Sequence, residues 1–256
     1  ITEVHLRLSP IPESIMSAVC HFPSLEDAVL TAQQVIQYGV PIARIEMLNA
    51  DQMGISINYS KLENIKAVPT LFFEFHGSES SNKENIKIVE ELSKDNNGSS
   101  FKWAKDLAER NKLWQARWDV YYSVKALHNN GRVYSTDVCV PISKITECVN
   151  FAEEQAKKFG IRAPMVGHMG DGNFHVVLPY DPKKKEMYKQ LRAFNDTLIR
   201  KALELNGTIT GEHGVGLHKK EYLLEQHPDN IPVMKSIKRT LDPNNIMNPG
   251  KIFDLN

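Results

Sequence analysis

The chain has 256 residues, and its 31 lysines and arginines balance its 31 aspartates and glutamates. This balance offers no basic surface for a nucleic acid or an anionic membrane, and the length is enough to bury a sizeable core in one or two domains. Its apolar runs have the length of strands and are too short to span a bilayer, and three cysteines without a CxxC pair favour a reducing compartment over a disulfide framework.

Strands and helices are expected to alternate along the first half of the chain. Residues 4–8 alternate in polarity like a strand that Pro10 ends, so we expect the chain to begin in the middle of a larger protein. A helix is predicted from Leu25 to Tyr38, because Ser24 is a good N-cap and Gly39 a good stop. The other elements expected here are strands at 42–47 and 70–76, helices at 49–59, 83–94 and 104–127, a polar loop at 95–100, and a turn at Asn129–Gly131.

The second half is expected to contain a glycine-linked hairpin. Strands predicted at 162–166 and 174–178 flank a glycine-rich turn, which favours direct pairing of the two strands. The other elements predicted are a strand at 133–140, a helix capped by Ser143 through Phe159, a helix at 183–206, two shorter helices, and a turn-rich tail at 241–251. Adjacent strand pairs among helices favour an α+β fold, with an antiparallel sheet covered by helices.

Two histidine-containing segments carry the strongest functional signal. The first sets His168 and His175 seven positions apart around a glycine turn, and the second holds Glu212 and His213 between glycines. Glycines on both sides of such clusters indicate that the backbone comes close to something bulky. Imidazole and carboxylate are ligands for zinc, which we expect first, and also for manganese or iron, and three protein ligands leave room for a substrate. We expect His168, His175 and Glu212 to bind a divalent metal, with His213 beside it as a base.

Neighbouring residues allow both structural and functional interpretations. Asp171 and Asn173 are expected to hold the glycine turn and support the ligands rather than to bind the metal. Arg117 lies in the predicted helix 104–127, where its guanidinium could bind a substrate carboxylate through two parallel hydrogen bonds. The same position also suits an ordinary surface arginine. The histidines could likewise be incidental to a glycine-rich turn.

The chain resembles the C-terminal part of the flavin-linked D-2-hydroxyacid dehydrogenases of the vanillyl-alcohol-oxidase type, and most closely their cytochrome-linked D-lactate dehydrogenase branch. The segments that carry the resemblance are 43–46, 114–117, 134–141, 167–175, 210–216 and 241–251. The resemblance implies the end of an FAD-binding domain at 1–10, a ferredoxin-like cap domain that holds the substrate at 11–210, and a segment at 211–256 that returns to the FAD domain.

The resemblance also implies a chemistry. FAD would be held mainly by a domain absent from this chain, in cis or on a separate chain, with Glu46 and Asn248 as contacts from this side. D-lactate would be oxidised to pyruvate by metal-assisted hydride transfer to FAD, and cytochrome c or a similar acceptor would take the electrons. Arg117 and His213 would bind the substrate, and His213 would accept its hydroxyl proton. The family branch implies a mitochondrial location, and this chain alone is expected to be an inactive fragment.

Substrate size can be argued from three positions. Relatives that oxidise hydroxyglutarate have a lysine at the position of Ser135, a small hydroxyl residue at Tyr121 and an asparagine at Val177. Without those polar groups a distal carboxylate would be poorly paired, which favours a short monocarboxylate such as D-lactate. A D-2-hydroxyglutarate or glycolate dehydrogenase, a flavin-free metal hydrolase and a catalytically silent cap fragment stay open as alternatives.

Overall fold

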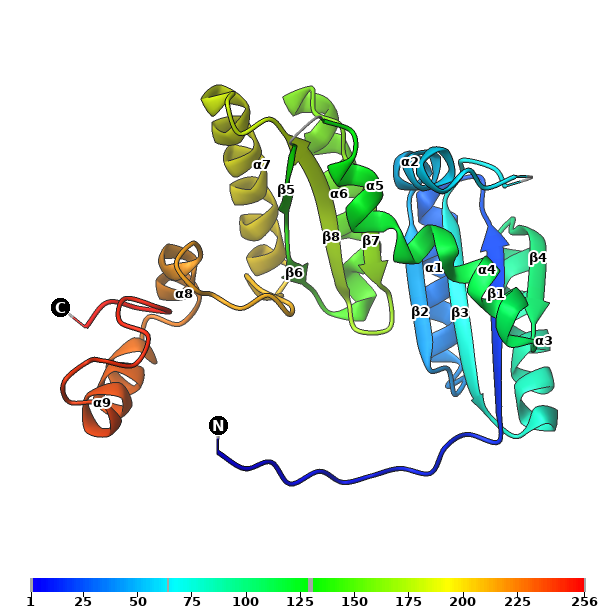
Figure 1. Ribbon diagram of the computed structural model, residues 1–256, viewed down its shortest axis with the longest axis horizontal. Helices are drawn as coiled ribbons and strands as arrows, with labels where there is room; N and C mark the ends of the chain where they lie inside the picture. Colours follow the sequence, from blue (N-terminus) through cyan, green and yellow to red (C-terminus); the bar gives the residue numbers. More distant parts are fainter. Residues whose placement is uncertain (1, 64, 129–130, 256) are drawn as a thin grey trace.

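The computed structural model describes residues 2–63, 65–128 and 131–255, and its centre is one sheet of eight strands. The sheet runs β4-β1-β3-β2-β7-β8-β5, and β6 also pairs with β8 (Figure 1). Each recorded pair is antiparallel, which confirms the predicted α+β class. The strands are β1 Ser14–His21, β2 Arg44–Leu48, β3 Thr70–Gly77, β4 Ser99–Ala104, β5 Arg132–Ser135, β6 Val138–Cys139, β7 Met165–His168 and β8 Asn173–Tyr180.

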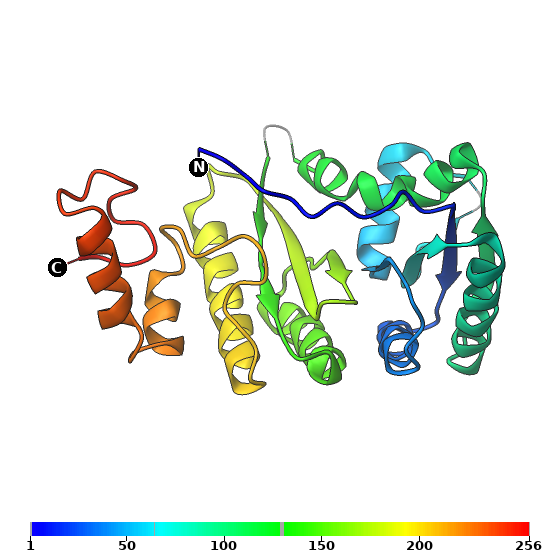
Figure 2. The same ribbon diagram turned by 90° about the horizontal axis from the view of Figure 1, so that it is seen from below.

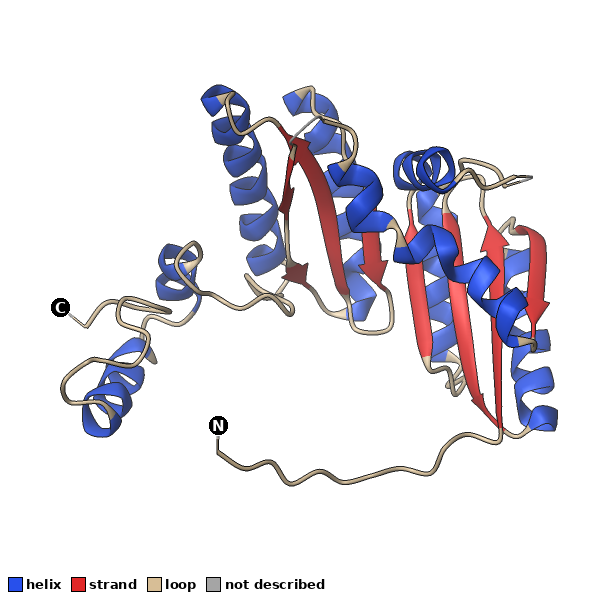
Figure 3. Cartoon of the chain, viewed as in Figure 1, coloured by secondary structure: helices blue, strands red, loops and turns tan. Residues whose placement is uncertain are grey.

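Helices cover the sheet on both faces. They are α1 Leu25–Gln37, α2 Ala50–Ser60, α3 Glu79–Asp95, α4 Leu107–Trp118, α5 Val120–Lys125, α6 Ile145–Phe159, α7 Lys185–Glu204, α8 Lys220–Gln226 and α9 Ile231–Leu241. Figure 2 shows α1, α3, α6 and α7 in a row on one face, with α2, α4 and α5 on the other. The helices α8 and α9 lie beyond the β5 edge (Figure 3). Among the described residues, no helix is both long and apolar enough to cross a membrane.

The alternation of side chains decides which residues can meet on each face of the sheet. On β2, Ile45 and Met47 belong to the core under α1, whereas Glu46 between them points to the face that carries α4. On β8, His175 alternates in the same way with apolar neighbours that belong to the core under α6 and α7. A smaller core on the α4 face includes Phe72, Trp114 and other buried residues. This face is where the functional residues gather.

The predicted strand at 4–8 was wrong. Val4, Leu6 and Leu8 are 64%, 75% and 86% exposed, and they lie outside any helix or strand. The first strand is β1, which the sequence pattern did not predict. It lies between β3 and β4 and is buried on both faces, so its residues show no polar–apolar alternation.

The predicted helix at 104–127 is two helices and begins later. Asp106 caps α4 by accepting hydrogen bonds from two backbone N–H groups, and residues 99–104 form the edge strand β4 instead. The helix breaks at Asp119, whose carboxylate accepts hydrogen bonds from Ser60 and Gln115. This break lets α5 follow α2 across the sheet. The predicted turn at residues 129–131 falls largely outside the described residues.

Two predictions for residues 133–144 also need correction. The predicted strand 133–140 is divided into β5 and β6, because Thr136 and Asp137 leave the ladder. Ser143 does not cap the following helix. It lies in a short 3-10 turn, Ile142–Lys144, and α6 then starts without a side-chain cap. By contrast, Ser24 caps α1 as predicted, since its hydroxyl accepts the N–H of Asp27.

Two buried thiols give a testable pH dependence. Burial raises the pKa of Cys20 to about 11 and that of Cys148 to about 12, from an ordinary value of 9.0. We expect the folded protein to resist iodoacetamide at these positions at pH 8. Above pH 9 the unfolded thiols ionise while the folded ones do not, so stability should fall as the pH rises toward 11. Mass-spectrometric labelling against pH measures the reactivity of the two thiols. Rapid labelling of either thiol in the native protein at pH 8 would contradict the raised pKa values.

Candidate functional site

Strand register brings three of the predicted site residues onto one face of the sheet. Glu46 on β2 lies opposite His168 on β7, and His175 on β8 lies opposite Val166 on β7. Because side chains two positions apart share a face, all three polar side chains point to the α4 side. The structure therefore confirms the predicted hairpin and its presentation of both histidines together.

The glycines in both segments allow close backbone contacts. Gly172, in the turn between β7 and β8, has a φ of +76°, and a Cβ there would lie 2.1 Å from the carbonyl oxygen of Val140. A Cβ on Gly211 would lie 2.5 Å from the side chain of Asn173. The second segment thus packs directly against the hairpin. Asp171 lies in the turn with its N–H bonded to the His168 carbonyl, as expected of a residue that holds the turn, whereas the role of Asn173 in supporting the ligands stays a prediction.

Hydrogen bonds to Nδ1 orient both imidazoles. Nδ1 of His175 lies 2.9 Å from the carbonyl oxygen of Thr136, and a carbonyl only accepts, so this nitrogen carries the proton. Nδ1 of His168 lies 2.7 Å from Oε1 of Glu46. The hydrogen bond to Glu46 raises the pKa of His168, whereas burial lowers the pKa of His175 and keeps that ring neutral. Both rings are thus arranged to present Nε2, which is how metal-binding histidines are commonly held.

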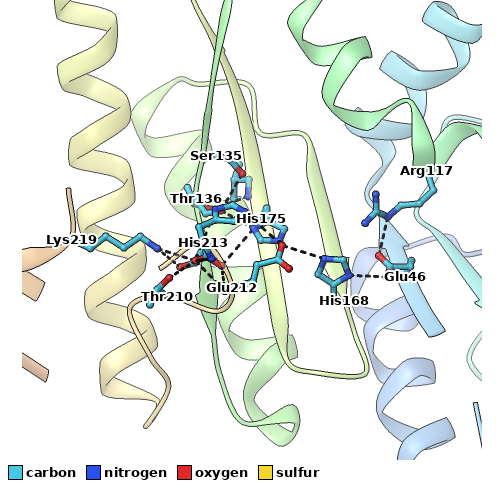
Figure 4. Close-up of polar contacts among 12 residues, drawn as sticks. Glu46, Arg117, Ser135, Thr136, His168, His175, Thr210, Glu212, His213 and Lys219 are labelled. Atoms are coloured by element: carbon cyan, nitrogen blue, oxygen red, sulfur yellow. Dashed lines mark hydrogen bonds and ion pairs between the residues drawn. The ribbon is translucent and has the colours of Figure 1, made fainter. Parts of the chain in front are cut away.

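The free ring atoms converge on one carboxylate. Oε1 of Glu212 lies 3.1 Å from Nε2 of His175 and 3.6 Å from Nε2 of His168 (Figure 4). Nε2 of His175 is buried and has no hydrogen-bond partner among the described residues. A neutral imidazole lone pair and a carboxylate oxygen repel each other unless a cation lies between them. These three ligand atoms lie within 4.8 Å of one another, so the site fits a divalent metal.

A second group, formed by Asp137, His175 and His213, also has ligand atoms within 4.8 Å. Its geometry is less suitable for a metal. Asp137 reaches only the Nδ1 side of His175, at 3.9 Å, and that nitrogen already donates to Thr136. The Asp137 carboxylate in turn accepts hydrogen bonds from several donors in the Glu212 segment. Of the two groups, His168, His175 and Glu212 therefore form the better candidate for a metal site.

His213 lies beside this group. Its ring stacks on that of His175, with centroids 4.8 Å apart and planes inclined by 13°. Its Nε2 is 3.6 Å from Oε1 of Glu212, and its side chain is 45% exposed. The ring can thus contact a substrate beside His168, His175 and Glu212 without being one of these three candidate ligands. Its role as a base stays a prediction.

Arg117 is connected to the site through Glu46. It lies in the last turn of α4, and its Nε donates to Oε2 of Glu46 over 2.9 Å. Burial opposes ionisation of Glu46, but the hydrogen bond from His168 and the charge of Arg117 hold its pKa below the ordinary value. Both carboxylate oxygens of Glu46 are therefore occupied by protein groups. The predicted contact of Glu46 with a cofactor stays a prediction.

Asn248 lies apart from these residues. It is exposed, has a φ of +47°, and belongs to the tail that follows α9, at the far end of the molecule from β2 (Figure 1). The structure does not bring it to the metal ligands. Its contact with a cofactor also stays a prediction.

Two residues of the site were not predicted from the sequence. Thr136 orients His175 through its carbonyl group, and Asp137 accepts the hydrogen bonds of the Glu212 segment. The available signal was a Thr-Asp pair inside an otherwise apolar strand pattern, Val133 to Val140. A buried carboxylate in such a run needs partners, and these came from residues more than seventy positions away.

Comparison with known proteins identifies the family of this chain. The family model described as FAD linked oxidases, C-terminal domain, matches residues 11–252. A protein named probable D-lactate dehydrogenase, mitochondrial, from Danio rerio is 44% identical over 256 residues, which are 100% of this chain and 51% of that protein. The Arabidopsis thaliana protein named D-lactate dehydrogenase (cytochrome), mitochondrial, is 37% identical over 99% of this chain and 45% of its own length.

The chain thus spans about half the length of these relatives. Among solved structures, a 4-ethylphenol oxidase from Gulosibacter chungangensis is similar in fold, with a TM-score of 0.71, although the two sequences are only 16% identical. The match covers 97% of this chain and 56% of the oxidase chain. At this level of identity the likeness supports the architecture of the sheet and helices alone.

Proposed function

This chain belongs to the FAD-linked oxidases as a C-terminal domain of that family, and we propose that its parent protein oxidises D-lactate to pyruvate with FAD as hydride acceptor. Two relatives that carry the name D-lactate dehydrogenase support this choice. The observation that carries the proposal is the convergence of His168, His175 and Glu212 beside a free imidazole and a guanidinium. This arrangement suits a small acid with an adjacent hydroxyl group.

We propose that these three residues hold a divalent metal, namely zinc, manganese or iron. Such an ion supplies Lewis-acid chemistry and would lower the pKa of the substrate hydroxyl, while FAD supplies the redox chemistry. The protein's contribution is to orient His168 and His175 through their Nδ1 protons, so that each ring directs its Nε2 to the site, while burial favours the neutral form of His175. Glu212, whose side chain is 51% exposed, completes the set on the open side.

The remaining residues bind the substrate and move its proton. Arg117 uses its Nε to hold Glu46, so its two Nη groups are the part of the guanidinium that can bind the substrate carboxylate. His213 then accepts the hydroxyl proton on a ring nitrogen, beside Glu212. Glu46 couples the two halves of the site, because one oxygen orients His168 and the other orients Arg117.

We propose that the flavin domain, in cis or on a separate chain, covers the apolar residues exposed on α4 and α5 and also reaches α9, beyond the β5 edge. The exposed apolar side chains are Leu107, Trp118, Tyr121 and Tyr122 on α4 and α5, and Val233, Ile237 and Leu241 on α9. Large apolar side chains exposed on neighbouring helices, as on α4 and α5, are typical of an interface. In this proposal residues 1–10 end the flavin domain, 11–210 form the substrate domain, and 211–256 return to the flavin, where Asn248 and Glu46 would contribute.

Substrate size gives one prediction. Ser135 and Val177 are cross-strand partners, and Val177 lies two residues beyond His175 on β8, on the same face. Ser135→Lys should place a cation where a distal carboxylate would lie, and we expect kcat/KM for D-2-hydroxyglutarate to rise about tenfold relative to D-lactate, as one charged hydrogen bond allows. Ser135→Met, which is long but uncharged, is the control. Equal effects of lysine and methionine would contradict the prediction.

The function itself is tested in the full-length protein. Purified protein should contain FAD and reduce cytochrome c or a dye with D-lactate but not with L-lactate, and a chelator should remove the activity. Activity with L-lactate alone would contradict the proposal. Chelator-sensitive hydrolysis without flavin would favour a metal hydrolase, and binding of neither metal nor hydroxy acid would favour a silent cap. The names of the relatives support a cytochrome acceptor and a mitochondrial location, which fractionation of cells would test.

A further inference from the structure

The buried carboxylate of Asp137 is a part of the site that the proposed function does not use. Its side chain is fully buried at the break between β5 and β6. It accepts hydrogen bonds from the Thr210 hydroxyl at 2.6 Å, the backbone N–H groups of Glu212 at 3.1 Å and His213 at 3.0 Å, and the Lys219 ammonium at 3.0 Å. All four donors lie within residues 210–219, the stretch that also carries the proposed metal ligand Glu212 and the proposed base His213 (Figure 4).

The segment needs this carboxylate because residues 211–216 form no helix or strand. Backbone N–H groups without a ladder need another acceptor, and two successive N–H groups aimed at one carboxylate fix the peptide planes between them. Burial opposes both charges of the pair and lowers the pKa of Lys219. At Asp137 the hydrogen bonds and the nearby cation outweigh burial and hold the pKa well below its usual range.

Asp137 is also joined to the histidine side of the site. Its neighbour Thr136 accepts the Nδ1 proton of His175 on its carbonyl oxygen, and its hydroxyl accepts the N–H of Val176 over 2.8 Å. One dipeptide, at the point where the strand breaks, thus contacts His175 on one side and the Glu212–His213 backbone on the other. Within the described residues, the other backbone connection nearby is the β-bridge between Cys139 and Thr208, which lies before the segment and does not reach Glu212 or His213.

We propose that Asp137, with Lys219 as its counter-ion, is a positioning residue that sets Glu212 and His213 against His175 before the metal binds. The inference rests on the proposed metal site. Asp137 touches neither substrate nor metal in this scheme and acts only through the segment that it holds. Its loss should therefore impair two functions together, metal affinity through Glu212 and proton transfer through His213.

The main test uses Asp137→Asn in the full-length, flavin-loaded protein. The amide keeps the shape but turns an NH2 group toward N–H donors. We expect the zinc dissociation constant, measured against a competing chelator, to rise by about 10- to 100-fold. At saturating zinc, kcat for D-lactate should still be lower by about 10- to 100-fold, because His213 stays displaced. A loss of zinc affinity alone, with kcat restored by excess zinc, would overturn the proposal.

A milder variant and its matched control test the proposal without the risk that Asp137→Asn misfolds. Thr210→Val removes one donor to Asp137 and keeps the charge pair, and we expect about a threefold to tenfold weaker zinc affinity. Thr208→Val is the matched control, because its hydroxyl donates to Gln226, 3.2 Å away, and not to Asp137. Equal zinc affinities and kcat values for the two valine variants would overturn the proposal.

Hydrogen exchange of the metal-free protein tests the positioning without any metal. The amides of Glu212 and His213 should be protected in the wild type and exchange freely in Asp137→Asn, while the flavin spectrum and the unfolding midpoint report an intact fold. Unprotected amides in the wild type would overturn the proposal. If His168→Ala left zinc binding unchanged, the proposed metal site would fail, and the exchange result would still decide whether Asp137 orders the segment.

Discussion

His175→Ala should remove the metal from the full-length protein and lower kcat/KM for D-lactate by about a thousandfold or more, since a Lewis acid contributes several kcal/mol to such a reaction. The physical reason is that His175 is the most buried of the three ligands, with its Nε2 unpaired and its Nδ1 fixed by Thr136. Elemental analysis after dialysis, together with D-lactate kinetics, measures both effects. His168→Ala should give the same pattern.

The control for this prediction is His21→Ala. His21 is a strand histidine as well, partly buried and held by a 2.9 Å hydrogen bond to Thr70, but it lies outside the proposed group of metal ligands. Its loss should lower stability to a similar degree and leave the metal in place. Retention of stoichiometric metal by His175→Ala, or its loss from His21→Ala, would show that the assigned ligand set is wrong.

His213→Ala should have the second large effect, with a different signature. We expect kcat to fall by about 100- to 10,000-fold, the usual contribution of a positioned general base, while metal content stays unchanged. The basis is that the ring stacks on His175 and faces the open side of the site without joining the His168 group. Stopped-flow measurement of flavin reduction by D-lactate isolates this step from later electron transfer.

His218→Ala serves as the matched control, because it is an exposed histidine only five positions along the same segment. That variant should reduce flavin at the normal rate, and added imidazole should partly restore His213→Ala. Loss of metal from His213→Ala would instead make His213 a ligand. Unchanged flavin reduction would remove it from the mechanism.

Much of the site could be predicted from local sequence, because its parts are encoded over short distances. The glycines between His168 and His175 allow a tight turn, and a hairpin then places side chains of like parity on one face. The Glu212–His213 segment was recognisable from the chemistry of its residues. Position along the chain does not reveal how close such segments come in the fold.

The predicted boundaries of helices and strands were wrong where contacts with residues distant in sequence are involved. The helix predicted at 104–127 breaks at Asp119, whose carboxylate accepts a hydrogen bond from Ser60 on α2. Strand β1 escaped prediction because burial on both faces removes polar alternation. Residues 4–8 show the opposite case: they alternate in polarity but are exposed and pair with no strand among the described residues.

The sequence by itself determined the α+β class, the hairpin and the chemical types of the groups proposed to bind a metal, because hydrophobic period and turn residues act over a few positions. Only the tertiary structure decided that β2 pairs with β7, which sets Glu46 against His168, 122 residues away. It also decided that Asp137 holds the Glu212 segment. Such contacts depend on which strands pair and which buried charge meets its donors, and local propensity encodes neither.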